Sequence, residues 1–315
     1  MDLMADIGAT NTRCALVDAK GEELAAESFR NADFPSLTNL LTSYLERRRV
    51  TDRPKCAALA VAAPIVGDEV RMLNIDWHFS QAELKADLGL AELVVCNDFA
   101  AIAWGLPYFS TADLHTVGGG QRVAGAALAT LGPGSGLGVG ALVPTTDGWA
   151  VMTGEGGHST LPATTQEEAD VIAQIRDRYD GHCSAERVLS GPGLVNVYVA
   201  LAELAGSRPP ADLAPAEVTT RAQRGEPLAV KALAMFFAFL GTVAGDLALT
   251  TGARGGVFIA GGIVPQLLDE LEQSEFRERF EAKGRYASYL GAIPTHVITA
   301  PLPAFRGLRH LLGYR

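Results

Sequence analysis

The chain has 315 residues, a mass of 33.1 kDa and a formal net charge of −10. Hydrophobic residues make up 48% and charged residues 20% of it, which is typical of globular proteins and not of disordered ones. The acidic balance argues against non-specific binding to nucleic acid or to an anionic membrane, because both need a basic surface. The length suggests about two domains, with a core large enough to need no disulfide or structural metal.

The cysteines are scattered along the chain and form no CxxC pair. They are Cys14, Cys56, Cys96 and Cys183. We therefore expect reduced thiols and a cytoplasmic protein, and the first residues show no signal peptide. The uncharged run 232–245 is too short to span a bilayer and indicates a buried core helix instead.

The N-terminal third alternates between strand and helix patterns. Leu3–Ile7 and Arg13–Val17 flank a glycine turn and predict a hairpin, with Glu22–Arg30 as a third strand. Ala57–Ala63 and Leu93–Cys96 are apolar without polar alternation, which is typical of strands buried on both faces. Before these two strands, apolar residues repeat on one face of a predicted helix. These residues are Leu37, Leu40, Leu41, Tyr44 and Leu45.

The pattern recurs in a second half that begins after residue 108. Ala126–Leu131 and Val139–Val143 flank another glycine-rich turn. Helices are predicted over Glu167–Tyr179, Leu194–Ala205, Leu228–Leu249 and Pro265–Phe280, and a buried strand over Gly256–Ile263. Two halves that each open with strand, glycine turn and strand predict a duplicated α/β fold with a cleft between two lobes.

The first glycine turn, Asp6–Arg13, reads DIGATNTR. Gly8 allows a tight turn, and neighbouring backbone N–H groups in such a turn form an anion site. Arg13 adds a cation, and Asp6 could organise a metal through water. The other candidate members are Ala9, Thr10, Asn11 and Thr12. An ordinary hairpin turn also favours Gly and Asn, so this turn alone only slightly favours phosphate binding.

The second glycine turn, Gly132–Gly140, reads GPGSGLGVG. A strand follows it where a dinucleotide-binding fold requires a helix, and the chain has no Walker motif. The context therefore excludes a Rossmann site and suits a second phosphate clamp, although a plain glycine-rich hairpin is the alternative. Its candidate members are Gly132, Gly134, Ser135 and Gly136.

The third glycine turn, Gly255–Pro265, reads GGVFIAGGIVP. A buried strand leads into Gly261 and Gly262, and a helix is predicted to follow. Glycines at this point let a flat ligand such as a purine approach the backbone. A close strand–helix junction explains the same residues about equally well.

Polar residues gather in three further segments. Asn97 and Asp98 follow a strand, where α/β proteins place ligands, although both residue types are also common helix caps. Glu155 and His158 lie in the EGGH segment, and Glu186 lies in SAERVLSG, where an acid in a first helical turn is the simpler explanation. Such acceptors and switchable donors suit the vicinal hydroxyls of a sugar. Together with the phosphate clamps they point to phosphoryl transfer onto a sugar hydroxyl, with Asp98 able to take the proton.

At these residues the chain resembles bacterial glucokinases of the cytosolic hexokinase type, in the sugar kinase–actin–Hsp70 superfamily. DIGATNTR and GPGSGLGVG are similar to the two phosphate motifs of that family, and GGVFIAGGIVP to its adenosine motif. NDFAA, GEGGH and SAERVLSGPGLVNVY are similar to its sugar-site segments. The resemblance runs from Met4 to about His310.

The resemblance implies a two-lobed, actin-like (ribonuclease H-like) fold, with a small domain at 1–108 plus 300–315 and a large one at 109–299. It implies ATP and glucose as ligands, Mg²⁺ on the ATP phosphates and a homodimer. Asp98 would be the general base on the glucose 6-hydroxyl. Asn97, Glu155, His158 and Glu186 would hold the other hydroxyls. The cysteine-rich zinc motif of a related branch is absent, so we expect no structural zinc.

Three alternatives stay open at this point. A kinase for mannose, fructose or an amino sugar would need the same residue types. A sugar-responsive repressor is disfavoured by the acidic charge and by a first strand that leaves no room for a helix-turn-helix. An actin-like filament protein would not need the EGGH and SAERVLSG segments. ADP or polyphosphate could also replace ATP as the phosphoryl donor.

Overall fold

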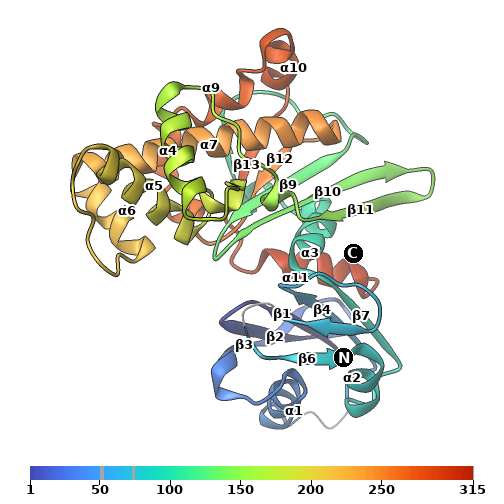
Figure 1. The fold of residues 1–315 in the computed structure, drawn as a ribbon. Coiled ribbons are helices and arrows are strands. Elements are labelled where there is room, and N and C mark those ends of the chain that lie inside the picture. Colours follow the sequence, from blue (N-terminus) through green and yellow to red (C-terminus); the bar gives the residue numbers. More distant parts are fainter. Residues whose placement is uncertain (50–52, 73–74, 315) are drawn as a thin grey trace. The chain divides into compact units, whose positions relative to one another are not determined.

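The computed structural model describes residues 1–49, 53–72 and 75–314. The chain divides into two compact units, each built on its own sheet (Figure 1). Unit 1 comprises Met1–Ser110 and Ala300–Arg315, and unit 2 comprises Thr111–Thr299.

The sheet of unit 1 has the strand order β3-β2-β1-β4-β7. Its strands are β1 (Asp2–Ile7), β2 (Asn11–Val17), β3 (Glu23–Arg30), β4 (Cys56–Val61) and β7 (Glu92–Asn97). The first three form antiparallel pairs, whereas β4 pairs in parallel with both β1 and β7. The predicted hairpin and its third strand are therefore confirmed.

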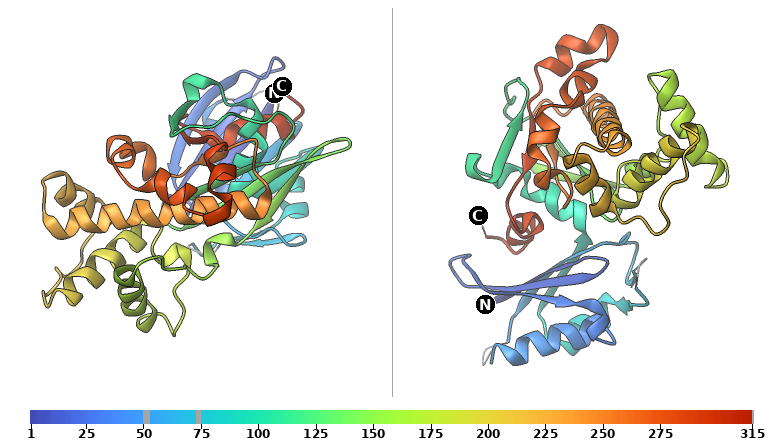
Figure 2. Two further views of the ribbon diagram at one scale, coloured as in Figure 1. Left: turned by 90° about the horizontal axis from the view of Figure 1, so that it is seen from above. Right: turned by 90° about the vertical axis from the view of Figure 1, so that its left-hand side faces the viewer.

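Helices cover both faces of this sheet (Figure 1). On one face lies α1 (Leu37–Arg47), whose five predicted apolar residues are all buried against the strands. On the other lie α3 (Asp98–Gly105) and α11 (Pro303–Leu311), which pack on each other and on β4. Both ends of the chain belong to unit 1 (Figure 2). The hydroxyl of Tyr314 donates to the Asp2 carboxylate at 2.6 Å, which ties the C-terminal segment to β1.

Burial of the two predicted inner strands differs. All of β4 after Cys56 is buried, as expected. The prediction for β7 was wrong, because Leu93–Asn97 are only half-buried and Glu92 is exposed. The reason is that β7 is the edge strand of its sheet. A small hairpin of β5 (Glu69–Arg71) and β6 (His78–Ser80) and the helix α2 (Gln81–Asp87) precede it.

Unit 2 repeats the pairing pattern of unit 1 in a sheet of order β11-β10-β9-β12-β13-β8. Its strands are β8 (Leu114–Val117), β9 (Leu128–Pro133), β10 (Leu137–Thr145), β11 (Gly148–Gly154), β12 (Val257–Ile259) and β13 (Thr295–Ile298). Here β9, β10 and β11 pair antiparallel, while β12 pairs in parallel with β9 and β13. The two sheets therefore share one topology, which confirms the predicted duplication; β8 adds an antiparallel edge.

Three of the helices predicted for unit 2 are confirmed as α4 (Gln166–Asp177), α5 (Gly191–Leu204) and α7 (Pro227–Thr251). The sequence patterns missed α6 (Pro215–Gln223), which packs on α5 and α7. With 25 residues, α7 is longer than its uncharged run suggested, and it could span a membrane by length and composition alone. However, 72% of its most apolar window is buried inside the structure. The burial of α7, and not its length, identifies it as a core helix.

The prediction of one continuous helix over Pro265–Phe280 was wrong. The segment forms a 3₁₀ turn and two short helices, α8 (Leu268–Glu272) and α9 (Phe276–Glu281). Between them, the Ser274 hydroxyl donates to the Leu271 carbonyl at 2.7 Å and accepts the Phe276 N–H at 3.1 Å. A serine that bonds nearby backbone in this way competes with the helical ladder. A further short helix, α10 (Ala287–Gly291), precedes β13.

Candidate active site

The carboxyl ends of the parallel strands in unit 1 form one edge of the sheet. Ile7 of β1 lies beside Val61 of β4, which lies beside Asn97 of β7. Neighbouring strands are about 4.8 Å apart. The register therefore puts the first glycine turn, the segment after β4 and Asp98 in a row along this edge.

The first glycine turn is held from beneath by Asn31, a residue that the sequence analysis did not identify. Its Nδ2 donates to the Gly8 carbonyl at 2.8 Å, and its Oδ1 accepts the Thr12 hydroxyl at 2.8 Å. Its backbone N–H donates to the Thr10 carbonyl at 2.9 Å. Both Asn31 and Thr12 are buried, so the Thr12 hydroxyl serves this network and is not presented at the surface. Nothing in the pattern around Asn31 pointed to it, because the contact depends on β3 returning beside β2.

The remaining residues of this turn are more accessible. The Gly8 N–H donates to the Asn11 carbonyl at 3.0 Å, which closes the turn. Gly8, Ala9 and Asn11 are half-buried and Thr10 is exposed. The backbone of this tight turn is therefore within reach of a ligand, as an anion site requires.

Asp6 and Arg13 form an ion pair at this turn. They lie opposite each other on β1 and β2, with 3.4 Å between the carboxylate and the guanidinium. Burial raises the pKa of the Asp6 carboxyl, and the nearby Arg13 charge opposes that rise. The side chain of Arg13 is 44% exposed, so its charge is open to a solvent-borne anion.

Asn97 and Asp98 join β7 to α3. The Asn97 Oδ1 accepts the N–H groups of Phe99 at 2.9 Å and Ala100 at 3.3 Å, so the capping role weighed for it is confirmed. Its Nδ2 donates to the Ala63 carbonyl at 3.4 Å, which ties the loop after β4 to the loop after β7. Asp98 is half-buried, and its Oδ1 accepts the N–H of Phe99 at 2.9 Å. The cap thus fixes the backbone from which the Asp98 carboxylate projects.

The second glycine turn, in unit 2, is held by the SAERVLSG segment. The Glu186 Oε2 accepts the N–H of Leu137 at 2.8 Å, and the N–H of Gly191 donates to the Gly134 carbonyl at 2.8 Å. Ser190 caps α5 and donates its hydroxyl to the Glu186 carbonyl at 2.8 Å. Glu186 does lie in a short helical turn, but its carboxylate contacts the glycine turn. Ser135, at the tip, is exposed.

The EGGH segment packs on the same glycine turn. It forms a 3₁₀ turn over Gly156–His158, in which the His158 N–H donates to the Glu155 carbonyl at 2.9 Å. A Cβ on Gly157 would lie 2.1 Å from the Leu137 carbonyl oxygen, so only glycine fits there. The side chains of Glu155 and His158 are both exposed. Unit 2 therefore brings the EGGH segment, through Gly157, and the carboxylate of Glu186 against one residue of the second glycine turn, Leu137.

The third glycine turn also lies against the second. Gly261 has a φ of +86°, and a Cβ on it would lie 2.2 Å from the Pro133 carbonyl oxygen. Nothing lies within 4 Å of the Cβ position of Gly262, which is exposed. Close packing on Pro133 of β9, and not a close strand–helix junction, explains Gly261. Gly262 keeps the open space that a flat ligand would need.

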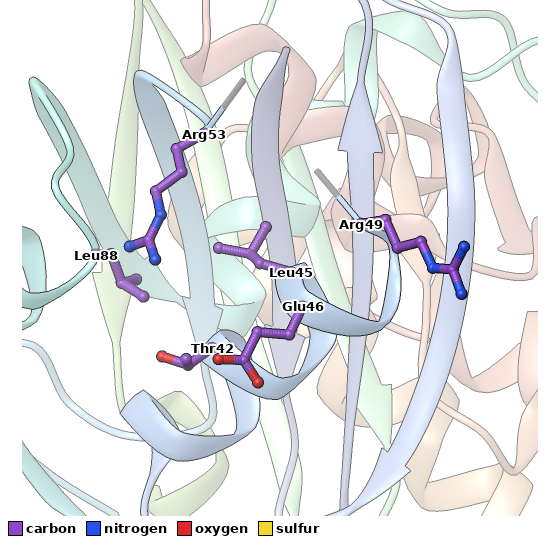
Figure 3. Close-up of a pocket in the computed structure, with 6 residues that line it drawn as sticks. All are labelled: Thr42, Leu45, Glu46, Arg49, Arg53 and Leu88. Atoms are coloured by element: carbon purple, nitrogen blue, oxygen red, sulfur yellow. The ribbon is translucent and has the colours of Figure 1, made fainter. Parts of the chain in front are cut away.

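A pocket in unit 1 is lined by other residues (Figure 3). It is formed by the end of α1 and the residue after α2, and Figure 3 shows the Arg53 guanidinium pointing toward Leu88. Its lining residues are Thr42, Leu45, Glu46, Arg49, Arg53 and Leu88. None of them belongs to the three glycine turns or to the three polar segments, so this pocket adds nothing to the candidate site.

Known proteins resemble this chain over nearly its whole length. A family model described as glucokinase matches residues 3–314. A glucokinase of Nitrobacter hamburgensis is 47% identical over 310 residues, which cover 98% of this chain and 96% of the relative.

Solved structures agree. A glucokinase crystal structure from an Antarctic psychrotroph has a TM-score of 0.87 and 38% identity, covering 99% of this chain and 98% of that one. A ROK family glucokinase from Streptomyces griseus, solved with glucose and AMPPNP, has a TM-score of 0.64 and 19% identity, covering 98% of each chain. The second match shows the fold alone, and both confirm the predicted fold class. The chain belongs to the glucokinase family, whose members transfer a phosphate group from ATP to glucose.

Proposed function

We propose that Asp98 is the general base of the glucokinase reaction in this chain and that the three glycine turns hold the ATP. The observation that carries the proposal is the register of β1, β4 and β7, which sets Asp98 and the first glycine turn on one sheet edge. In phosphoryl transfer the protein does little covalent work, so such positioning supplies most of the catalysis. Asp98 would take the proton of the glucose 6-hydroxyl while the hydroxyl oxygen attacks the γ-phosphorus, the bond from that phosphorus to the bridging oxygen breaks and ADP leaves.

The sugar would be held by the residues of the three polar segments. These are Asn97 and Asp98 after β7, Glu155 and His158 of EGGH, and Glu186 of SAERVLSG. The support is that the EGGH and SAERVLSG segments, distant in sequence, converge on Leu137. Carboxylates accept hydroxyl protons, and an imidazole both donates and accepts, so this set suits vicinal hydroxyls. Glucose in the Streptomyces griseus structure is consistent with this substrate.

The nucleotide would lie on glycine-rich backbone. The first turn would contribute Asp6, Gly8, Ala9, Thr10, Asn11 and Arg13, with Thr12 supporting them through Asn31. The second would contribute Gly132, Gly134, Ser135 and Gly136, and the third Gly261 and Gly262 beside the adenosine. Backbone N–H groups in such turns bind phosphate oxygens. The AMPPNP of the Streptomyces griseus structure is consistent with ATP as the donor.

Magnesium is the metal that this chemistry implies, and Asp6 fits it. Mg²⁺ keeps several waters and is usually held by one or two carboxylates together with substrate phosphates. The Asp6 carboxylate is a single such group beside the first glycine turn, 18% exposed and paired with Arg13. Its carboxylate would hold the ion through water. When bound, Mg²⁺ neutralises charge that develops on the phosphates.

The base assignment is tested by Asp98→Asn and Asp98→Ala. We expect kcat to fall by roughly 10²–10⁴-fold, the usual contribution of general acid–base catalysis. Glucose affinity by calorimetry should stay within about threefold for the Asn variant, because an amide still accepts a hydrogen bond. Asp87→Asn, at an exposed position at the end of α2, is the matched control. A kcat near that of the unaltered protein in Asp98→Ala would overturn the assignment.

Hexose choice is tested by a coupled assay with Mg-ATP and a panel of sugars. Turnover that strongly favours glucose supports the proposal, whereas faster turnover of mannose, fructose or an amino sugar would reassign the substrate. Replacing ATP by ADP or polyphosphate in the same assay tests the donor.

We further propose a homodimer in the cytoplasm. The dimer rests on the family resemblance, and the location rests on four cysteines that are all free thiols. Sedimentation equilibrium measures the first, where a single species at the monomer mass would contradict it. Fractionation of cells measures the second.

A further inference from the structure

Leu137 joins the second glycine turn to both sugar segments. Its N–H donates to the Glu186 carboxylate at 2.8 Å. A Cβ on Gly157 would lie only 2.1 Å from the Leu137 carbonyl oxygen, so the EGGH segment packs directly against Leu137. Leu137 therefore contacts the segment of Glu186 through its N–H and the segment of Glu155 and His158 through its carbonyl group.

Gly136, next to Leu137, leaves the space that the Glu186 carboxylate occupies. A Cβ on Gly136 would lie 2.4 Å from the Glu186 Oε2 and 3.2 Å from its Cδ. Real Cβ atoms do not approach another atom so closely, so one of the two groups would have to move. The group in the way is the end of a flexible side chain, not backbone. A methyl group at position 136 would therefore push the carboxylate aside while the strands stay paired.

We propose that Gly136 is a positioning residue for the sugar, because its missing side chain keeps the Glu186 carboxylate in place. This inference rests on the proposed binding of glucose by Glu186. This role is additional to the nucleotide contact proposed above for the same glycine. A change inside a phosphate turn would then weaken sugar binding even when no nucleotide is present.

The test is glucose affinity measured by calorimetry without nucleotide. Gly136→Ala should raise the Kd for glucose about tenfold, equivalent to about 1.4 kcal/mol. Gly134→Ala is the matched control, since nothing lies within 4 Å of its Cβ position in the same turn. We expect its glucose Kd without nucleotide to stay within about twofold, well below that tenfold change. An unchanged Kd in Gly136→Ala would overturn the proposal.

Glu186→Ala separates this inference from the function on which it rests. If Glu186→Ala leaves the glucose Kd unchanged, the sugar assignment of Glu186 fails and the inference fails with it. If Glu186→Ala weakens binding but Gly136→Ala does not, only the inference fails. In a Glu186→Ala background, adding Gly136→Ala should have no further effect, because the carboxylate that it displaces is gone.

The double variant also covers a failure of Gly136→Ala to fold. Removing the carboxylate makes room for the methyl group, so Gly136→Ala with Glu186→Ala should regain the thermal midpoint of Glu186→Ala. A double variant that stays unfolded would show that the methyl group clashes with something other than Glu186, which contradicts the proposal.

Discussion

The first and second glycine turns occupy the same place in their two sheets but are held by different means. In unit 1 a buried side chain holds the turn, because Asn31 forms hydrogen bonds with the Gly8 carbonyl and the Thr12 hydroxyl, each at 2.8 Å. A Cβ on Gly8 itself would meet only the Asn11 carbonyl, at 3.2 Å, which is tight but not prohibitive.

The second turn is held by close contact of backbone with backbone and with one carboxylate. Added Cβ atoms on Gly157, Gly261 and Gly136 would approach their neighbours to 2.1, 2.2 and 2.4 Å. The side chain that bonds the backbone of this turn is that of the half-buried Glu186. The same topology is therefore held in two ways. The first turn depends on the hydrogen bonds of Asn31, and the second depends on glycines where no side chain would fit.

The largest expected effect is that of Gly157→Ala. The methyl group would meet the Leu137 carbonyl, and this backbone cannot shift without breaking the pairing of β10 with β9. We expect kcat/KM to fall more than about 100-fold and the thermal midpoint to drop by several degrees, since overpacking typically costs about 1–3 kcal/mol. Coupled assays and thermal unfolding measure both. Gly154→Ala, with nothing within 4 Å of its Cβ position, is the control. Equal behaviour of the two variants would contradict the packing argument.

Asn31→Ala should destabilise the first turn because it removes hydrogen-bond partners, whereas Gly157→Ala fills space. The Gly8 carbonyl and the Thr12 hydroxyl would lose their bonds, at about 1–3 kcal/mol for each buried group left unpaired. We expect the KM for ATP to rise about tenfold while the glucose Kd without nucleotide stays within about twofold. The same substitution at the exposed Asn39 is the control. A loss of stability with an unchanged KM for ATP would mean that Asn31 supports the fold but does not position the turn.

The smallest effect is expected from Thr12→Val, which keeps the shape and removes the hydroxyl. The Asn31 Oδ1 would lose its 2.8 Å bond, and unfolding should become easier by about 1–2 kcal/mol. Thr12→Ser, which keeps the donor, should lie closer to the unaltered protein. Denaturant unfolding measures both variants. The unaltered protein, Thr12→Val, Asn31→Ala and the variant with both changes form a double-mutant cycle. Strict additivity in that cycle would rule out the Thr12–Asn31 bond as the source of the effect.

Local patterns predicted the elements well where one residue type decides the structure. The periodic apolar face of α1 and the glycine turns between β1 and β2 and between β9 and β10 needed no tertiary information. Prediction failed where a polar side chain or a sheet position intervened. Ser274 interrupts the expected helix over 265–280, and the place of β7 at a sheet edge leaves it half-buried.

The candidate site divides in the same way. Motifs named the glycine turns, Asp98, Glu155, His158 and Glu186, because glycine and carboxylate chemistry is legible in short segments. They missed Asn31, since an asparagine after a strand is common and its partners lie 19 and 23 residues away.

By itself the sequence determined the family, the duplicated strand–turn–strand pattern and the residue types of the site, since each is local or carried by a continuous motif. The tertiary structure alone decided which glycines are required by packing and which side chains hold the turns. That Gly136 makes room for Glu186, 50 positions along the chain, depends on how the 3₁₀ turn Ala185–Arg187 lies against the glycine turn before β10, and a single sequence does not show contacts between distant segments.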